Sequence, residues 1–280
     1  MRAQRDFRGK VVVVTGAAGG IGAALAERFA RSGAQLALLD RDAEALAALA
    51  SRLAGSGTDC LALACDITDE FDVARTIAAV IAHYGGVDVL INNAGITQRS
   101  LFADTSVSVF RKVMDVNFFG SLHCTKAALA SLSERRGMII VTSSIAGVAP
   151  LYERSGYAAS KHALHGLFAS LRAELSGSGV DVMIVCPGFT KTGISRAALD
   201  GTGGTASHAQ STVGKMATPE SVADAVFGGA TRNQRLLVLT TVGKTSALLN
   251  RLFPDLYERL MTRSIRRELE RQACHDLVQT

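Results

Sequence analysis

The chain has 280 residues, of which 48% are hydrophobic and 20% charged, a composition typical of a folded globular protein and not of a disordered one. The formal net charge is +5, and basic residues are scattered until the C-terminal tail, which argues against nucleic-acid binding. No apolar run approaches the roughly 20 residues of a transmembrane helix, and charged residues interrupt positions 1–10. We therefore expect a cytoplasmic protein without a membrane span or a signal peptide.

Five cysteines are spread along the chain without the spacing of a metal site or a CxxC motif. Their odd number is typical of reduced thiols in an intracellular protein. No metal ion is therefore predicted. The cysteines are Cys60, Cys65, Cys124, Cys186 and Cys274.

A strand, a glycine-rich loop and a helix are predicted in that order near the N-terminus. The β-branched run Val11–Val14 is typical of a buried strand, and helix-forming residues over 23–31 follow the loop. Glycines in such a loop let the backbone approach a pyrophosphate, whose charge lies against the helix N-terminus. The loop residues concerned are Gly16, Gly19, Gly20, Ile21 and Gly22.

The next predicted strand, Leu36–Leu39, ends in Asp40, which is followed by Arg41. An acidic residue at this position can accept hydrogen bonds from the ribose of an adenine dinucleotide. A glycine-rich loop alone is often only a tight turn. The loop, its strand and Asp40 together favour a dinucleotide-binding site.

Strands and helices then alternate, which predicts a parallel sheet covered by helices on both faces. The predicted strands are Cys60–Ala64, Val87–Ile91, Met138–Val141, Val180–Val185 and Leu236–Leu239. The predicted helices are Ala43–Leu53, Glu70–Tyr84, Val107–Leu132, Ser155–Leu175 and Pro219 to about Ala230. The predicted fold class is α/β, a single-domain doubly wound parallel sheet over residues 1–280 with a helical C-terminal extension.

Polar residues follow several of these strands, where ligands bind in open parallel sheets. Tyr157 and Lys161 lie four residues apart on a predicted helix, so their side chains share one face. A fixed positive charge favours the phenolate and lowers the phenol pKa, as a general acid/base near neutral pH requires. The alternative is an ordinary surface pair. Likewise, Asp66 could cap a helix, Asn93 could form a turn, and Asn117 could face solvent.

Two segments break the alternation. Residues 192–216 are rich in small residues and too long for an ordinary connection, which suggests a mobile substrate lid. Residues 244–280 form the predicted helical extension, with an apolar face and several arginines. This face could pack on its own domain or on a sister subunit, or close over the pocket; a membrane-surface helix is the alternative. The apolar face comprises Leu249, Leu252, Phe253, Leu256 and Leu260.

Six motifs, taken in order, resemble the signatures of the short-chain dehydrogenases/reductases. They extend over most of residues 8–240, and the glycine loop has the wider TGxxxGxG spacing of this family. The resemblance implies a Rossmann-like fold and an NAD(P)-dependent enzyme that interconverts an alcohol and a ketone or aldehyde. The motifs are Thr15-Gly16-x-x-x-Gly20-x-Gly22, Asn92-Asn93-Ala94-Gly95, Asn117, Ser144, Tyr157-x-x-x-Lys161 and Pro187-Gly188.

The resemblance also implies a role for each position. Tyr157 would donate or accept the proton, Lys161 would lower the phenol pKa and bind the nicotinamide ribose, and Ser144 would polarise the substrate oxygen. Asn117 would hold a water that links Lys161 to solvent. The glycine loop and Asp40 would bind the pyrophosphate and the adenosine ribose. Further cofactor contacts would come from Asp66, Ile67, Asn93, Ala94, Gly95, Pro187, Gly188, Thr190 and Thr192.

The predicted cofactor is NAD(H), because Asp40 would repel a 2′-phosphate and the glycine loop holds no basic residue. NADP(H) stays possible, since Arg41 could meet a phosphate. Apolar residues near the site predict a lipophilic alcohol or carbonyl substrate, and the family predicts a homodimer or homotetramer. A nucleotide-sugar epimerase or dehydratase with tightly bound NAD, and a non-catalytic dinucleotide-sensing scaffold, are the alternatives. The predicted substrate-pocket walls are Ile145, Ala146, Leu151, Tyr152 and Phe189.

Overall fold

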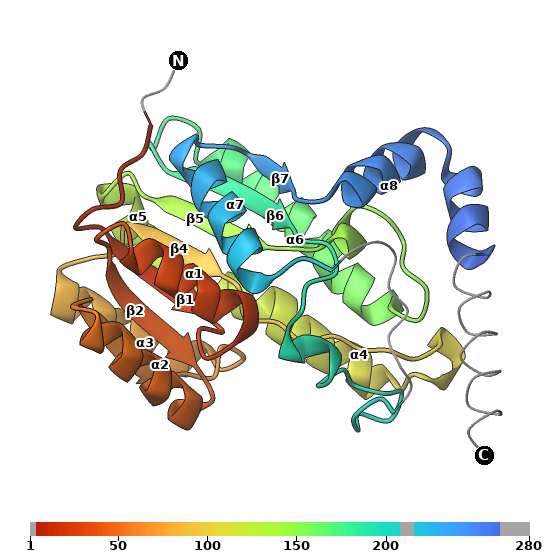
Figure 1. Ribbon diagram of the computed structural model, residues 1–280, viewed down its shortest axis with the longest axis horizontal. Coiled ribbons are helices and arrows are strands. Elements are labelled where there is room, and N and C mark those ends of the chain that lie inside the picture. Colours follow the sequence, from red (N-terminus) through yellow and green to blue (C-terminus); the bar gives the residue numbers. More distant parts are fainter. Residues whose placement is uncertain (1–3, 208–215, 264–280) are drawn as a thin grey trace.

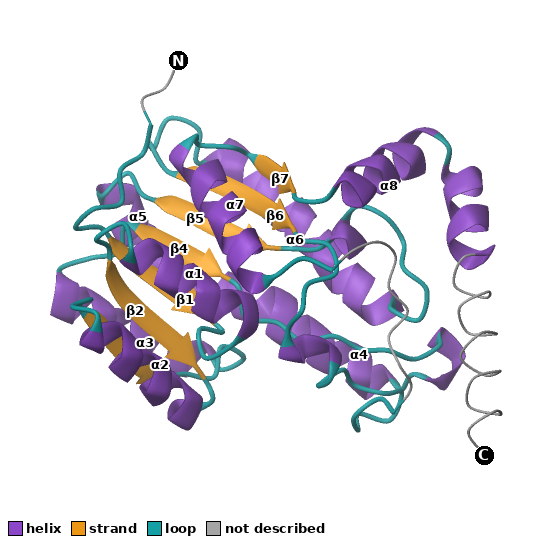
Figure 2. Ribbon diagram, in the orientation of Figure 1, coloured by secondary structure: helices purple, strands orange, loops and turns teal. Residues whose placement is uncertain are grey.

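A seven-stranded sheet runs through the centre of the molecule and carries helices on both faces (Figure 1, Figure 2). The computed structural model describes residues 4–207 and 216–263. All neighbouring strands are parallel, in the order β3-β2-β1-β4-β5-β6-β7, as the α/β prediction requires. The strands are β1 (Val11–Thr15), β2 (Gln35–Asp40), β3 (Cys60–Ala64), β4 (Val89–Asn92), β5 (Met138–Thr142), β6 (Asp181–Cys186) and β7 (Leu236–Val238).

The strand order reverses between β1 and β4. The chain builds outward from β1 to β3, and then crosses back to place β4 on the other side of β1. At such a reversal the connections leave the sheet in opposite directions, so a crevice opens at the carboxyl ends of the strands. The glycine-rich loop follows β1 at this crevice.

Alternate residues of the strands point into two separate hydrophobic layers. Val12 and Val14 of β1 pack with helices α1, α2 and α7, whereas Val11 and Val13 pack with α3, α5 and α6. A strand buried on both faces must be apolar at every position, which explains the run of valines. The helices are α1 (Gly20–Ala30), α2 (Ala43–Gly55), α3 (Glu70–Tyr84), α4 (Val107–Met114), α5 (Gly120–Glu134), α6 (Ser155–Glu174), α7 (Pro219–Thr231) and α8 (Thr241–Leu252).

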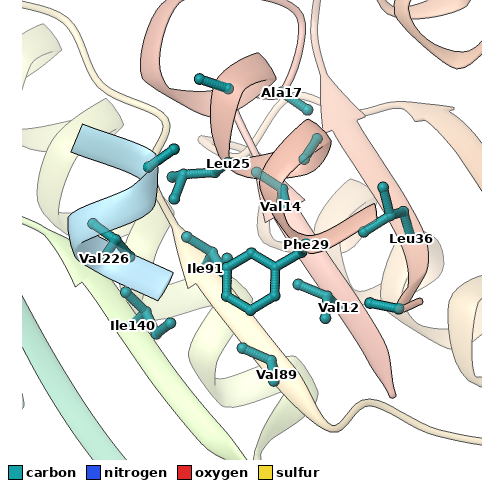
Figure 3. Packing of buried hydrophobic residues seen from close by; sticks show 14 of the residues in the cluster. Val12, Val14, Ala17, Leu25, Phe29, Leu36, Val89, Ile91, Ile140 and Val226 are labelled. Carbon is teal, nitrogen blue, oxygen red and sulfur yellow. The ribbon is translucent and has the colours of Figure 1, made fainter. Parts of the chain in front are cut away.

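Figure 3 shows the first of these layers around Phe29 of α1. The ring lies between Val12, Val89 and Ile91 of the sheet and Val226 of α7, and it is fully buried. Edge-to-face contacts place the Phe29 centroid 5.0 Å from that of Phe7 and 5.2 Å from that of Phe227. This packing fixes α1, and with it the loop at its N-terminus.

The long helix predicted over Val107–Leu132 is divided by a π-helical turn at Asp115–Phe119, between α4 and α5. The turn contains Asn117, whose side chain is fully buried. Its Oδ1 accepts from Ile96 N at 2.8 Å and its Nδ2 donates to Ile96 O at 3.0 Å. Such turns insert a residue into a helix and often lie at functional sites. The alternative in which Asn117 faces solvent is wrong.

The C-terminal extension is helical, but it begins earlier than predicted and is broken. The Thr240 hydroxyl accepts from Gly243 N at 2.9 Å and caps α8, which ends at Leu252. A second helical stretch occupies residues 254–263, while 264–280 lie outside the described residues. Among the described helices, none is long and apolar enough to cross a membrane. The short 3-10 turns are Phe102–Asp104, Ile145–Gly147 and Gly193–Ser195.

The described part of the predicted lid, residues 192–207, is irregular apart from the turn at Gly193–Ser195. It is hydrogen-bonded to the loop after β4: Leu199 N donates to Thr97 O at 2.9 Å, and Arg99 N donates to Leu199 O at 2.7 Å. Residues 208–215 of the segment lie outside the described residues. A lid function stays a prediction.

Candidate active site

A cavity of about 1710 Å³ lies at the carboxyl ends of the strands, in the crevice where the strand order reverses. Nearly all the predicted site residues line it, from the glycine loop and Asp40 to Ser144, Tyr157 and Pro187. The two exceptions are Gly22 and Asn117, which lie behind its wall. One continuous cavity therefore brings together side chains that are far apart in the sequence.

The glycine loop is closely packed beneath this cavity. Gly16 and Gly20 have φ of +64° and +55°, a left-handed conformation that glycine adopts at little cost. A Cβ at Gly16 would lie 2.7 Å from the Cα of Ala94, and one at Gly22 would collide with the Gly16 carbonyl. Helix α1 starts here with no side-chain cap and no acidic residue in its first turn. The loop thus presents free backbone N–H groups, which fit a pyrophosphate.

Hydrogen bonds fasten this loop to the segment after β4. The Thr15 hydroxyl accepts from Asn93 N at 3.0 Å and from Ala94 N at 3.1 Å. In return, Asn93 Nδ2 donates to Thr15 O at 3.1 Å and to Gly16 O at 3.3 Å. Asn93 is therefore more than a turn former, because its side chain joins the carboxyl ends of β1 and β4.

Two carboxylates, those of Asp40 and Asp66, line the cavity. Asp40 accepts from Ala18 N at 2.9 Å and from Asp42 N at 3.1 Å, one bond to each oxygen. It is half-buried and keeps free lone pairs on both oxygens. Asp66 accepts from the backbone N–H and hydroxyl of Thr68. The cap of α3 is Asp69 and not Asp66, so the alternative that made Asp66 a helix cap is wrong.

Tyr157 and Lys161 both lie on α6 and line the cavity, with Ser144 of the loop after β5 beside them. Lys161 Nζ lies 5.6 Å from the centroid of the Tyr157 ring. The Ser160 hydroxyl donates to the backbone carbonyl of Tyr157 at 2.7 Å and accepts from Asn117 Nδ2 at 2.9 Å. Asn117 therefore braces the helical turn that carries the tyrosine and the lysine.

The expected lowering of the Tyr157 pKa is not found in this structure. Burial raises the phenol pKa above its usual value, and the Ser144 hydroxyl and the Arg154 charge oppose this only in part. The ammonium of Lys161 does not donate to the phenol. Its Nζ donates to the backbone carbonyl of Thr142 at 2.8 Å. The sequence could show the spacing of the pair but not how deeply both groups are buried.

Lys161 carries a buried charge that opposes folding. The residue is 3% exposed, and burial lowers its pKa from 10.5 to about 8. Between these two pH values the unfolded chain binds more protons than the folded one, so this group makes stability rise with pH. Below about pH 8 the full penalty applies, on the order of 3 kcal/mol.

We therefore expect Lys161→Met to stabilise the protein at pH 7 by about 1–3 kcal/mol, since it removes the buried charge and keeps the apolar stem. The gain should shrink as the pH rises from about 8 toward 10.5, because the folded protein then holds the lysine neutral and the unfolded chain loses its proton progressively. Urea unfolding at pH 7 and pH 10 measures both effects. Lys126→Met, on the exposed surface of α5, is the control. A Lys161→Met protein less stable than wild type at pH 7 contradicts this account.

The other end of the cavity is apolar. Ile145, Ala146, Leu151 and Phe189 line it as predicted, whereas Tyr152 does not. The C-terminal extension adds a further wall, so of the positions that the sequence left open for it, the one over the pocket gains support. Its cavity-lining apolar residues are Val242, Leu248, Leu249, Leu252, Phe253, Tyr257, Leu260 and Met261.

Two hydrogen bonds hold this extension against the loop after β5. Asn250 Nδ2 donates to Val148 O at 3.2 Å, and the Tyr257 hydroxyl donates to Pro150 O at 3.2 Å. Of the alternatives for its apolar face, packing on its own domain gains support from these contacts. The face is only partly covered, since Leu252 and Phe253 remain 58% and 59% exposed.

Sequence reasoning missed four charged residues that line the cavity, Arg111, Lys112, Asp115 and Arg154. Of these, Arg154 lies three residues before Tyr157. Its guanidinium is buried and donates from Nη1 to the Thr97 hydroxyl at 2.6 Å. No motif marks it, because its partner is 57 residues away in the sequence. Only the fold brings the two together.

Comparison with known proteins agrees with this geometry. Residues 10–202 match the short chain dehydrogenase family. The chain is 36% identical over 274 residues to mouse (Mus musculus) dehydrogenase/reductase SDR family member 7B, covering 96% of this chain and 85% of that protein. The Xenopus laevis protein of the same name is 38% identical over 271 residues, covering 94% and 84%.

A solved structure is also similar. It is a short-chain dehydrogenase/reductase from Burkholderia phymatum in complex with NAD, with a TM-score of 0.81 and 26% identity. The match covers 90% of this chain and 96% of that one. The chain belongs to the short-chain dehydrogenase/reductase family and is an NAD(P)-dependent oxidoreductase that acts on CH–OH groups.

Proposed function

We propose that this enzyme interconverts a lipophilic alcohol and the corresponding ketone or aldehyde, with Tyr157 as the proton donor and acceptor. The observation that carries the proposal is the continuity of one cavity. The Tyr157 phenol, the Ser144 hydroxyl and the Lys161 ammonium line its wall between a glycine loop that fits a pyrophosphate and an apolar end. A substrate oxygen between Tyr157 and Ser144 would receive hydrogen bonds from both hydroxyl groups.

The cofactor that we propose is NAD(H), which supplies or accepts the hydride when it is bound. The glycine loop would hold its pyrophosphate, and Asp40 would accept from the adenosine ribose. Lys161 would bind the nicotinamide ribose, with Pro187, Gly188, Thr190 and Thr192 around the nicotinamide. The free lone pairs of Asp40 support this assignment, as does the absence of a basic side chain from the glycine loop.

Asp40→Asn tests the cofactor assignment. The amide keeps one oxygen to accept a backbone N–H but removes the negative charge that would repel a 2′-phosphate. We expect the preference for NADH over NADPH to fall by about 10- to 100-fold, measured as a ratio of Kd values by fluorescence titration. Asp42→Asn, the N-cap residue of α2, is the control and should leave the ratio unchanged. Tighter binding of NADPH than of NADH by the wild type contradicts the assignment.

The substrate class follows from the apolar end of the cavity, where Ile145, Leu151 and Phe189 meet the C-terminal extension. A panel of ketones and aldehydes of increasing hydrocarbon size, assayed with NADH by loss of nicotinamide absorbance, tests it. We expect kcat/KM to rise with apolar surface, because burial of each methylene stabilises the complex by about 0.8 kcal/mol. A preference for small, strongly polar carbonyl compounds overturns the lipophilic assignment.

A further inference from the structure

Two arginines are buried near Tyr157, close enough for the charge of one to act on the other. Arg99, in the loop after β4, and Arg154, at the start of α6, are each 6% exposed. Arg154 lines the cavity, and its charge acts on the Tyr157 phenol. Arginine is seldom buried to this extent unless it is paired. The chemistry described so far uses neither residue.

The hydrogen bonds of these arginines leave donors unused. Arg154 donates from Nη1 to the Thr97 hydroxyl at 2.6 Å, and Arg99 donates from Nη2 to Ala206 O at 3.3 Å. The Nε of Arg99 is buried and has no partner among the described residues. A buried donor without an acceptor is costly, so its presence in a native protein calls for an explanation.

The charge of the cluster is also unbalanced. Burial lowers the pKa of both guanidinium groups, and each arginine has Glu153 as the carboxylate that opposes this shift. Within residues 4–207 and 216–263, no carboxylate oxygen lies within 4.0 Å of either guanidinium. One carboxylate acting on two cations leaves an excess positive charge in this poorly solvated region, where Arg154 lines the cavity and Arg99 does not.

We propose that Arg154, supported by Arg99, binds an anionic group of the substrate, a carboxylate or a phosphate, close to the reacting carbon. The planar guanidinium fits both anions, because two of its N–H groups can donate to two oxygens at once. The position of Arg154, one helical turn before Tyr157, places this anion at the reacting end of the substrate. This inference rests on the proposed function, since it assigns the substrate of that same site.

The first test compares pairs of substrates in which one member is anionic and the other is neutral. Benzoylformate is set against methyl benzoylformate, and phenacyl phosphate against 2-hydroxyacetophenone, each reduced with NADH. We expect the wild type to prefer the anionic member of at least one pair by about 10- to 100-fold in kcat/KM, the effect of hydrogen bonds to a charged group. A larger preference in the benzoylformate pair indicates a carboxylate substrate, and a larger preference in the phenacyl phosphate pair indicates a phosphate substrate.

Arg154→Gln should remove most of that preference, because it should lower kcat/KM for the anionic member much more than for the neutral member. Arg154→Lys keeps the positive charge but cannot donate two parallel hydrogen bonds to one anion, so it should retain part of the preference for the anionic member. Arg99→Gln should have the same effect as Arg154→Gln but smaller, and Arg75→Gln, on the exposed surface of α3, should have none. Equal losses for the anionic and the neutral substrates would overturn the proposal and make Arg154 a residue that acts only through Tyr157.

A binding measurement separates this proposal from the proposed function. Phenylacetate and phenyl phosphate cannot be reduced, so calorimetry with these probes reports the anion site even if no ketone is turned over. Binding of either probe that Arg154→Gln abolishes supports the site, whatever the redox assays show. Turnover of neutral ketones without any such binding supports the proposed function and refutes the anion site.

Discussion

Tyr157→Phe is expected to lower kcat by about 10²- to 10⁴-fold, the contribution usual for a general acid/base. The substitution removes only the phenolic oxygen and leaves the ring in the cavity wall. The Kd for NADH, measured by fluorescence titration, should therefore stay within about threefold of wild type. The reductase assay uses the best ketone of the substrate panel.

Tyr152→Phe is a matched control for this substitution. It removes the same atom five residues away, from a side chain that does not line the cavity, and it should keep full activity. A Tyr157→Phe enzyme with the kcat of wild type would show that another group transfers the proton. An equal loss in both variants would point to a general effect on the loop before α6.

Gly22→Ala is expected to abolish cofactor binding. The new Cβ would collide with the Gly16 carbonyl and lie 2.7 Å from Asn93 Nδ2, so the start of α1 must move away from the glycine loop. The N–H groups that fit the pyrophosphate would then separate. We expect the Kd for NADH to rise at least about 100-fold and the protein to lose about 1–3 kcal/mol of stability, as for overpacking in a core.

Gly55→Ala controls for the loss of a glycine. Gly55 is exposed at the end of α2, with no atom within 4 Å of an added Cβ. This variant should bind NADH as the wild type does and be as stable or slightly more stable. Wild-type affinity in Gly22→Ala would show that the loop does not need this close packing.

The features predicted from sequence are those that the chain encodes locally. The β-branched run of β1 and the glycines after it specify a buried strand and a tight turn within a few residues. The spacing of Tyr157 and Lys161 places them on one face of α6. The reversal of strand order then brings such local signals to one cavity, which is why nearly all the predicted residues line it.

The features that sequence reasoning missed depend on contacts between distant segments. The π-helical turn at Asn117 leaves the apolar pattern of its helix intact, and only the bonds to Ile96 and Ser160 fix it. Arg154 is part of the site because Thr97 holds it there. The raised pKa of Tyr157 follows from burial that the assembled cavity imposes. None of these contacts leaves a periodic or spaced pattern along the chain.

The C-terminal extension is a feature that the sequence predicted only in part. Its apolar face was recognised in the sequence, but the direction of that face depends on the hydrogen bonds of Asn250 and Tyr257 to the loop after β5. These bonds bring Leu249 and Leu252 to the cavity. An amphipathic pattern predicts that a helix has a partner surface and does not identify it.

The most direct test of the proposed function is transfer of deuterium from labelled NADH. The cofactor carries deuterium at both positions of the nicotinamide C4 and is incubated with enzyme and the best ketone of the panel. We predict one deuterium on the carbinol carbon of the alcohol, formed in equal amount to NAD⁺, and at most about 1% as much of this product with Tyr157→Phe over the same time. An alcohol without deuterium at that carbon, or product formed with no net oxidation of NADH, would contradict the account.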